Sequence, residues 1–195
     1  MIEVYYDTET TGTNHRKHSI IQLSGIIEKN GKEIDRFKFN VKPHPKAIIE
    51  PEALVANGHK LEDLQGYEDM GRVHKRLIAI LSRYVDRYNP KDKAWLIGYN
   101  NRAFDDFFLR KFFELNDDIY IGSWFWNDTI DVLVLASQQL QGQRSMLKNF
   151  KLQTVAEFLG IDVDPEKLHD SMYDTEITRE ARKILVDKDF CADLF

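Results

Sequence analysis

Three strand-like segments at the start of the chain constrain its fold more than any other feature. Residues 2–6, 20–27 and 34–41 are rich in β-branched and aromatic side chains, which favour strands. The dipeptide Asn30-Gly31 between the second and third segments is typical of a tight hairpin turn. Gly25, inside the second segment, indicates a bulge or a close approach of another part of the chain. We therefore expect the chain to begin as an antiparallel β-meander.

Helical patterns dominate the remainder of the chain. Apolar side chains recur at helical spacing over residues 73–88, and Asn89-Pro90 ends that pattern. Residues 94–99 have the composition of a buried strand. Further helices are expected over residues 101–115, 129–140, 152–159 and 171–186. This order predicts an α/β fold in which helices flank a mixed β-sheet.

Length and composition limit the class of protein. With 195 residues, of which 43% are hydrophobic, the chain is expected to form a single domain over residues 1–195 and is not a disordered tail. Its longest apolar runs, such as residues 132–136, are far shorter than the ~20 residues of a membrane span. We expect no signal segment before the first strand, and the single cysteine, Cys191, excludes an internal disulfide and a cysteine-based zinc cluster. We expect a soluble, intracellular, cytoplasmic protein without a membrane partner.

The net charge of −5 argues against broad, nonspecific coating of nucleic acid, which requires a basic surface. An acidic protein can still bind phosphates where divalent cations occupy some of its carboxylates. The positions of the acidic residues therefore matter more than their number.

The first acidic feature is the pair Asp7 and Glu9 at the end of the first predicted strand. Side chains two residues apart on a strand share a face, so these carboxylates lie side by side. Such a pair repels and loses solvation unless a cation or water lies between its members. A solvated strand end followed by a polar turn is the alternative interpretation. Gly12, shortly afterwards, permits a close backbone approach.

The second acidic feature is the pair Asp105 and Asp106 near the start of a Phe-rich helix. Asp105 shares a helical face with Phe108 and Leu109, so it is expected to point inward. Asp106 is expected to be the more solvent-facing of the two. Both residues could alternatively be ordinary first-turn acids favoured by the helix dipole.

The third feature joins His169 to Asp174. Apolar residues from Ile177 to Leu185 form one helical stripe, and Asp174 precedes that stripe on its inward face. Asp170 or Ser171 is expected to cap this helix at its N-terminus. His169 falls in the preceding loop, where a histidine is usually an ordinary surface residue.

Three separate segments thus each supply an inward acidic side chain near the end of an element. Carboxylates that converge without a cation repel one another and lose solvation. Hard oxygen ligands suit Mg²⁺ or Mn²⁺. Two such ions ~4 Å apart form the arrangement used for in-line phosphoryl displacement.

The three motifs resemble those of the DnaQ-like 3′→5′ exonucleases, in their DEDDh subgroup on an RNase H-like fold. The resemblance spans residues 1 to about 187. Residues 7–12, with the sequence DTETTG, are similar to the first exonuclease motif. The second motif is matched by Asn101, Phe104, Asp105, Phe108 and Leu109. The third motif is matched by His169 and Asp174. Residues 131–136 look like the DTLxLA helix of the family, with Val132 where Thr is usual.

Two positions refine this resemblance. The subgroup that uses a tyrosine base would carry it at position 170, which is Asp170 here, so the histidine subgroup fits. Asn100 is a departure, because many relatives carry a histidine before the motif asparagine. This departure concerns a local contact rather than the chemistry.

The resemblance implies a role for each motif residue. Asp7, Glu9, Asp105 and Asp174 would bind two divalent cations, Mg²⁺ or Mn²⁺, and His169 would accept the proton of the attacking water. Thr10, Thr11 and Gly12 would contact the terminal nucleotide. Asn101, Phe104 and Phe108 would help to form the wall of the site, although ordinary helix packing explains them as well.

Three functions are compatible with this pattern. The first is a metal-dependent 3′→5′ exonuclease that releases nucleoside 5′-monophosphates from DNA, with single-stranded DNA as the expected substrate. Its partners would be nucleic acid with a free 3′ end and, as a candidate, a DNA polymerase or another replication protein. The second is an exoribonuclease similar to RNase T or oligoribonuclease. The third is a non-catalytic nucleic-acid-binding or polymerase-accessory module, which the complete set of acids with His169 argues against.

Other polar and aromatic groups have competing interpretations. Two basic groups, Arg16-Lys17-His18 and Lys148 with Lys151, either guide a strand or are solvated loops. The aromatic segment 124–126 either stacks on unpaired bases or packs in the core. Asp128 is expected to cap the helix that follows it, and Asp131 to have a structural role.

Overall fold

The computed structural model describes residues 1–187, so Cys191 and the end of the expected single domain lie outside the described residues. The chain begins with β1 (Ile2–Thr10), β2 (Ile20–Lys29) and β3 (Lys32–Asn40), which pair antiparallel in sequence. The β2–β3 turn has positive φ angles at Asn30 (53°) and Gly31 (77°), as a tight hairpin requires. The predicted meander is therefore confirmed.

Two further strands extend the sheet on the other side of β1. The strand β4 (Trp95–Gly98) runs parallel to β1, and the two-residue β5 (Ile130–Asp131) runs parallel to β4. The strand order is β3-β2-β1-β4-β5, which places β1 in the middle of a mixed sheet. The pairing with β4 covers only Glu3 to Tyr5, so the carboxyl end of β1 pairs with β2 alone.

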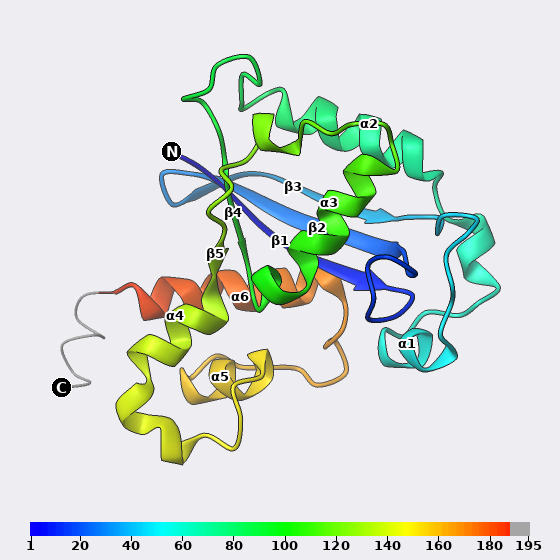
Figure 1. Cartoon of the computed structure of the whole chain (residues 1–195). Helices are drawn as coiled ribbons and strands as arrows, with labels where there is room; N and C mark the ends of the chain where they lie inside the picture. Colours follow the sequence, from blue (N-terminus) through cyan, green and yellow to red (C-terminus); the bar gives the residue numbers. More distant parts are fainter. Residues whose placement is uncertain (188–195) are drawn as a thin grey trace.

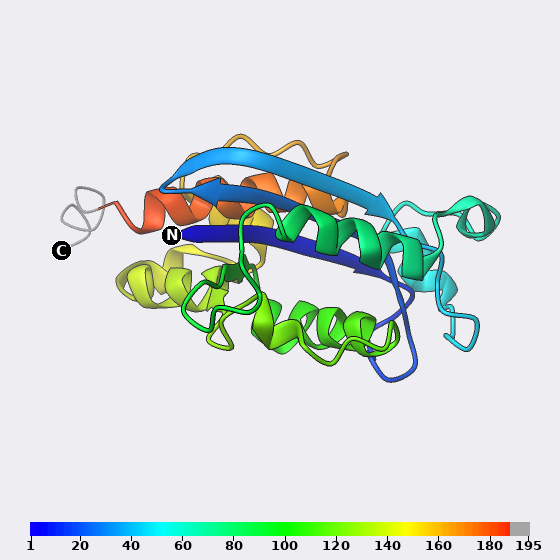
Figure 2. The same ribbon diagram turned by 90° about the horizontal axis from the view of Figure 1, so that it is seen from above.

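Helices cover both faces of this sheet (Figures 1 and 2). The helices are α1 (Pro51–Ala56), α2 (Met70–Leu81), α3 (Asp105–Glu114), α4 (Val132–Gln139), α5 (Leu152–Phe158) and α6 (Ser171–Leu185). Short 3₁₀ segments are η1 (Asp63–Gly66), η2 (Asn101–Ala103), η3 (Ile121–Ser123) and η4 (Gln141–Met146). The predicted α/β class, a mixed sheet flanked by helices, is confirmed.

Alternation along β1 divides the core into two layers. Val4 and Tyr6 pack with α2 and α3, whereas Tyr5 packs with α4, α5 and α6. Trp124 and Phe125 belong to the first layer and are almost fully buried, so the packing interpretation holds for both. No helix within residues 1–187 is long and apolar enough to cross a membrane.

Tertiary contacts move several predicted helix ends. The helix predicted over 73–88 runs from Met70 to Leu81, and Val85 is buried from the turn that follows. Before α4, residues 130–131 form β5 instead of helix. Asp131 caps α4 by accepting a hydrogen bond from the Leu133 amide, so the prediction that Asp128 is the cap is wrong.

Gly25 marks a close approach rather than a bulge. A Cβ atom at this position would lie 2.4 Å from the Phe37 ring and 2.9 Å from the Tyr5 carbonyl oxygen. The register shifts of the sheet lie elsewhere, between Ile27 and Glu28 and between Glu9 and Thr10. The second shift falls at the carboxyl end of β1, where the acidic motif begins.

Candidate active site

The end of β1 places Asp7 and Glu9 on one face of the sheet, two residues apart. Thr8, on the opposite face, donates hydrogen bonds to the Asp105 carboxylate through its amide (3.2 Å) and its hydroxyl. These bonds tie the first turn of α3 to β1. The two strand carboxylates and the helix carboxylate are thus fixed relative to one another.

The N-terminal end of α6 carries the third motif. Asp170 caps the helix by accepting hydrogen bonds from the amides of Met172 and Tyr173. The buried Ser171 donates both its amide and its hydroxyl to the Gln22 side chain of β2, each at 2.8 Å. The cap and the β2 contact together fix the first turn of α6, which carries Asp174.

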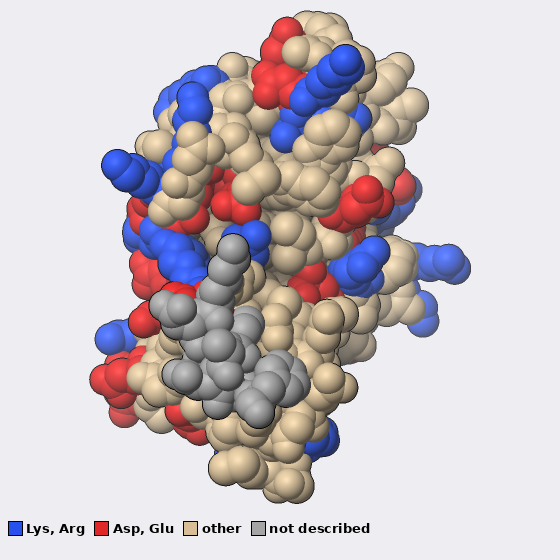
Figure 3. Space-filling model, turned by 90° about the vertical axis from the view of Figure 1, so that its left-hand side faces the viewer, with Lys and Arg blue, Asp and Glu red and all other residues tan. Residues whose placement is uncertain are grey.

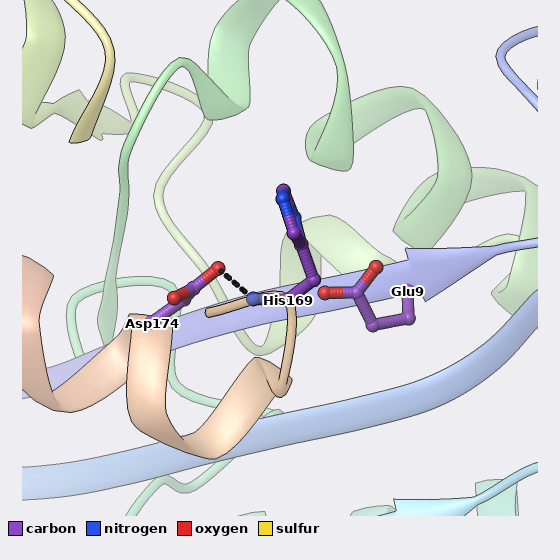
Figure 4. A group of neighbouring side chains, drawn as sticks. All are labelled: Glu9, His169 and Asp174. Atoms are coloured by element: carbon purple, nitrogen blue, oxygen red, sulfur yellow. Dashed lines mark hydrogen bonds between the residues drawn. The ribbon is translucent and has the colours of Figure 1, made fainter. Parts of the chain in front are cut away.

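His169 occupies the left-handed region, with φ 67°, directly before the helix cap. A non-glycine residue in this conformation is uncommon and is retained where the surrounding structure requires it. The backbone amide of His169 donates to Asp174 at 3.3 Å, which closes the turn. The exposed imidazole stands above the end of β1, between the two carboxylates (Figure 4).

All five residues predicted for catalysis line one open pocket of about 320 Å³. One ligand atom of each of Glu9, His169 and Asp174 lies within 4.8 Å of the other two. The pocket is completed by Thr8, Tyr99, Asn100, Phe104 and Leu152. Segments far apart in the sequence thus converge at the carboxyl end of the central strand.

Burial and like charge make the pocket unfavourable for ionised carboxylates. Burial, together with the nearby Asp174 and Asp105 carboxylates, raises the pKa of Glu9 to about 9. Burial raises the pKa of Asp105 to about 7 and that of Asp174 to about 6. The pKa of Asp7 is raised well above its usual range by burial and by its acidic neighbours.

The donor set fits divalent cations. Hard carboxylate oxygens converge from three elements, and the buried Oδ1 of Asp174 has no hydrogen-bond partner among the described residues. A cation in this pocket would supply the missing partner and offset the mutual repulsion of the carboxylates.

Thr10, Thr11 and Gly12 bend the chain after β1. The Thr10 hydroxyl donates to the Gly12 carbonyl oxygen, and the Thr11 hydroxyl donates to the Ile48 carbonyl oxygen. A Cβ at Gly12 would lie 2.5 Å from the His18 ring, so this position requires glycine. These hydrogen bonds stay within the protein, and contact of the three residues with a nucleotide remains a prediction.

The residues predicted from the second motif take different positions. Phe104 lines the pocket, whereas Phe108 is buried in the α2–α3 core layer. Asn101 is buried outside the pocket lining and donates to Asp106 at 3.1 Å. Their contact with substrate also remains a prediction.

Asp106 is more exposed than the buried Asp105, as expected, but it is not a free surface residue. Its carboxylate is half-buried and accepts hydrogen bonds from Tyr6, Asn101 and Thr129. The helical pattern places Asp106 correctly outside the pocket. The three donors come from other parts of the chain, which periodicity does not place.

Sequence reasoning missed several residues that support the pocket. Thr8 holds Asp105, and Asn57 donates to the Thr10 carbonyl oxygen at 2.9 Å. Asn100 lines the pocket in the left-handed conformation, with φ 59°. The one available signal was Asn100 itself, an asparagine next to the second motif and of a type that tolerates positive φ.

The basic groups near the motifs are mostly exposed. Arg16, Lys17, Lys148 and Lys151 are solvent-accessible. His18 is instead buried and lies 3.2 Å from the Glu50 carboxylate, so it is part of the support for the turn after β1.

The fold and the pocket together define the class: an α/β nuclease domain that gathers acidic side chains at the end of a central strand. The family model described as Exonuclease, of the RNase T type, matches residues 4–181, and the chain belongs to this family. The resemblance to the DnaQ-like exonucleases found in the motifs is therefore confirmed.

Related proteins include both polymerases and ribonucleases. The PolC-type DNA polymerase III of Mycoplasma pneumoniae is 31% identical over 180 residues, which are 91% of this chain and 11% of that protein. Ribonuclease T of Shewanella frigidimarina is 27% identical over 195 residues, covering 95% of this chain and 82% of that protein. The chain thus spans about a tenth of the PolC relatives.

Among solved structures, the chain resembles E. coli exonuclease I in complex with a dT13 oligonucleotide. The TM-score is 0.76 at 22% identity, over 94% of this chain and 40% of that one. The zinc-bound exonuclease I–ssDNA complex gives a TM-score of 0.78, over 98% of this chain and 42% of that one. At this identity the likeness establishes the fold.

Proposed function

We propose that this chain is a metal-dependent 3′→5′ exonuclease that shortens single-stranded DNA and releases nucleoside 5′-monophosphates. The observation that carries the proposal is the convergence of Asp7, Glu9, Asp105, Asp174 and His169 in one pocket. Four carboxylates and an imidazole in this arrangement fit phosphodiester hydrolysis with two divalent cations. Membership of the exonuclease family supports the same reading.

Each group has a defined task in this proposal. Asp7, Glu9, Asp105 and Asp174 hold Mg²⁺ or Mn²⁺, which would activate a water molecule and stabilise the departing 3′ oxygen. His169, at the exposed rim, accepts the proton of the attacking water. The terminal nucleotide is received by the turn at Thr10, Thr11 and Gly12 and by the wall around Phe104. Asn101 and Phe108 lie behind this wall.

Digestion of labelled single strands tests the proposal. A 5′-labelled DNA 20-mer should shorten progressively with Mg²⁺ or Mn²⁺, release nucleoside 5′-monophosphates, and remain intact in EDTA. The Asp7→Asn variant serves as the control for a contaminating nuclease. Degradation that starts at the 5′ end, or that continues in EDTA, contradicts the proposal.

RNA is the second candidate substrate. Ribonuclease T relatives match this chain over most of their length, whereas the PolC match covers 11% of the polymerase. A comparison of kcat/KM on DNA and RNA oligonucleotides of the same sequence decides between them. Faster hydrolysis of RNA would identify the exoribonuclease.

The proposal of a link to replication is supported by the PolC likeness alone. We propose a DNA polymerase or another replication protein as the partner of this chain, acting with it in the cytoplasm. Co-purification of the chain with a polymerase, lost when the polymerase is depleted, is the expected result.

A further inference from the structure

A series of aromatic rings runs from the pocket to the surface of the protein. Phe104 lines the pocket, and its ring centroid lies 4.9 Å from that of Phe108. Phe108 meets His15 edge-on at 6.3 Å. His15 in turn stacks on Phe107 at 5.1 Å with an interplanar angle of 17°. The rings therefore form one contiguous series that ends at Phe107.

Phe107 presents an open, oriented ring at the end of this series. It is 46% exposed, whereas Phe108 beside it is 2% exposed. A single exposed aromatic residue is common on protein surfaces. Phe107 differs because His15 holds its ring and connects it to the pocket. A ring held in place loses little conformational freedom when a ligand stacks on it.

Three basic residues lie close in the sequence to the two stacked rings. Arg16 and Lys17 directly follow His15 and are exposed, and Arg110 lies three residues after Phe107 on the same face of α3. Within residues 1–187, none of these three cations forms an ion pair with an acidic side chain.

This group of basic residues contrasts with the net charge of the whole chain, which is −5. Acidic and basic side chains are interspersed on the face that lies at the left in Figure 1 (Figure 3). Arg16 and Lys17 next to His15, and Arg110 three residues after Phe107, therefore supply basic side chains close in the sequence to the two rings.

We propose that the Phe107–His15 pair is a stacking platform for an unpaired base upstream of the 3′-terminal nucleotide. This inference rests on the proposed function, because it assumes that the 3′ end lies in the pocket. Arg16, Lys17 and Arg110 attract the phosphates of the same strand, and the aromatic faces bind its base. Base stacking of this kind is tolerant of sequence, since every base has a π face.

The platform also favours single strands over duplexes. In a duplex, each base is covered on both faces by its neighbours, and its face does not reach a protein ring. In a single strand, an upstream base is free to stack on Phe107. The platform therefore contributes to the choice of strand type without reading the sequence.

Binding of a short oligonucleotide to Phe107 variants tests the proposal. Fluorescence anisotropy with 5′-fluorescein-labelled (dT)10 and (U)10 is measured with Ca²⁺ replacing Mg²⁺. Phe107→Ala should weaken binding about 5- to 100-fold, in the range of one lost base stack. Phe107→Trp should restore it, and Phe107→Leu should not, because leucine keeps apolar area but lacks a ring.

An abasic site locates the base that stacks. Abasic residues are placed singly along (dT)10, and one internal position should weaken binding to the wild type without further weakening binding to Phe107→Ala. Tyr88→Ala is the matched control, because Tyr88 is an aromatic residue that is 88% exposed. It lies on the segment before β4, and Trp95 of β4 pairs with the start of β1, at the other end of that strand from the pocket. This variant should bind like the wild type.

Kinetics separate this inference from the proposed function. Phe107→Ala should raise KM for the 10-mer, leave kcat unchanged and leave dinucleotide hydrolysis unaffected. Equal binding of wild type and Phe107→Ala overturns the platform while leaving the nuclease proposal intact. If oligonucleotide binding depends on Phe107 but no hydrolysis is seen, the nuclease proposal is overturned and the platform proposal is retained. A wild type that binds neither oligonucleotide overturns both.

Discussion

The pocket gathers four acidic side chains, and the protein alone does not compensate their negative charge when they are ionised. Asp7, Glu9, Asp105 and Asp174 all have raised pKa values, chiefly because of burial. Such groups cost stability when ionised and become favourable only when positive charge is added. This trade between stability and function is typical of catalytic sites.

Replacing one of these acids should therefore separate activity from stability. The variants Asp7→Asn, Glu9→Gln, Asp105→Asn and Asp174→Asn should each lose most of the nuclease activity. Asp7→Asn should raise the Tm of the metal-free protein at pH 8, because one charge is removed from a buried cluster. Activity assays and thermal melts in EDTA measure both effects. An Asp7→Asn protein that melts earlier than wild type would show that Asp7 has a structural role.

His169 should affect the rate rather than metal binding. The four acids already supply the ligand charge, and the imidazole lies at the exposed rim of the pocket. His169→Ala should bind Mn²⁺ with wild-type affinity and lower the maximal rate roughly 10²–10⁴-fold, as expected for loss of a general base. Calorimetric Mn²⁺ titration and single-turnover kinetics test this. Loss of Mn²⁺ binding would make His169 a ligand, and an unchanged rate would make it a bystander.

Asp106 should be important for stability. Its carboxylate accepts hydrogen bonds from Tyr6, Asn101 and Thr129. An amide provides one acceptor oxygen instead of two, so Asp106→Asn leaves a donor unsatisfied. We expect a loss of about 1–3 kcal/mol in the free energy of unfolding and unchanged Mn²⁺ binding, measured by urea unfolding and calorimetry. Glu114→Gln, on the mostly exposed last residue of α3, is the control and should change stability little.

At the scale of elements, the contact between α6 and β2 decides whether the third motif reaches the pocket. Gln22 accepts from both the amide and the hydroxyl of Ser171, and the Ser24 hydroxyl lies 2.6 Å from that of Ser171. These bonds satisfy donors at a helix N-terminus that would otherwise be buried without partners. The position of His169 and Asp174 therefore depends on a residue outside the three motifs.

Gln22→Met should expose this dependence. Methionine has a similar size but accepts no hydrogen bond of comparable strength, so the Ser171 donors lose their partner. We expect a loss of about 1–3 kcal/mol in stability together with a lower kcat. Lys38→Met, which removes the exposed ion pair with Asp170 in the same region, should cost at most about 1 kcal/mol. An unfolding curve for Gln22→Met that superimposes on that of wild type would contradict this account.

The sequence predicts those elements whose signal is local. The meander follows from β-branched segments and the Asn30-Gly31 turn, and the inward side of Asp105 follows from its spacing to Phe108 and Leu109. Features that depend on distant partners were missed. The early end of α2 at Leu81, the cap at Asp131 and the hydrogen bonds of Asp106 all follow from contacts that periodicity does not contain.

The same distinction applies to the candidate site. The motif residues were found because their order and spacing are specific, and the structure gathers all five in one pocket. The supporting residues Thr8, Gln22 and Asn57 were not found, because each acts through a hydrogen bond across elements. Such residues carry no local pattern of their own.

At the scale of the whole molecule, the pocket makes stability depend on pH and on metal. The folded-state pKa values of Asp174, Asp105 and Glu9 are about 6, 7 and 9, whereas unfolded carboxyl groups titrate near 4. The folded protein therefore binds more protons than the unfolded chain between these values. The contribution of each group to stability is complete below about pH 4 and is lost as the pH rises through its folded-state pKa.

Metal-free protein should accordingly lose stability between pH 5 and pH 9, by at most about 1.4 kcal/mol per pH unit for each group that titrates. Mg²⁺ binds the ionised carboxylates, so the rise in Tm that it causes should be larger at pH 8 than at pH 5.5. Burial lowers the pKa of His59 and His74, so the contributions of these two residues to stability increase as the pH rises. Comparing the Tm with and without Mg²⁺ at each pH removes these histidine contributions.

Glu9→Gln should flatten the metal-free profile above pH 7, because it removes the group with a pKa of about 9. Thermal melts across this range, in EDTA and in Mg²⁺, provide the measurement. The stability of the metal-free wild type could instead rise steadily toward pH 9, with the same slope in Glu9→Gln. This result would show that the pocket carboxylates are solvated and do not repel one another in a buried cluster.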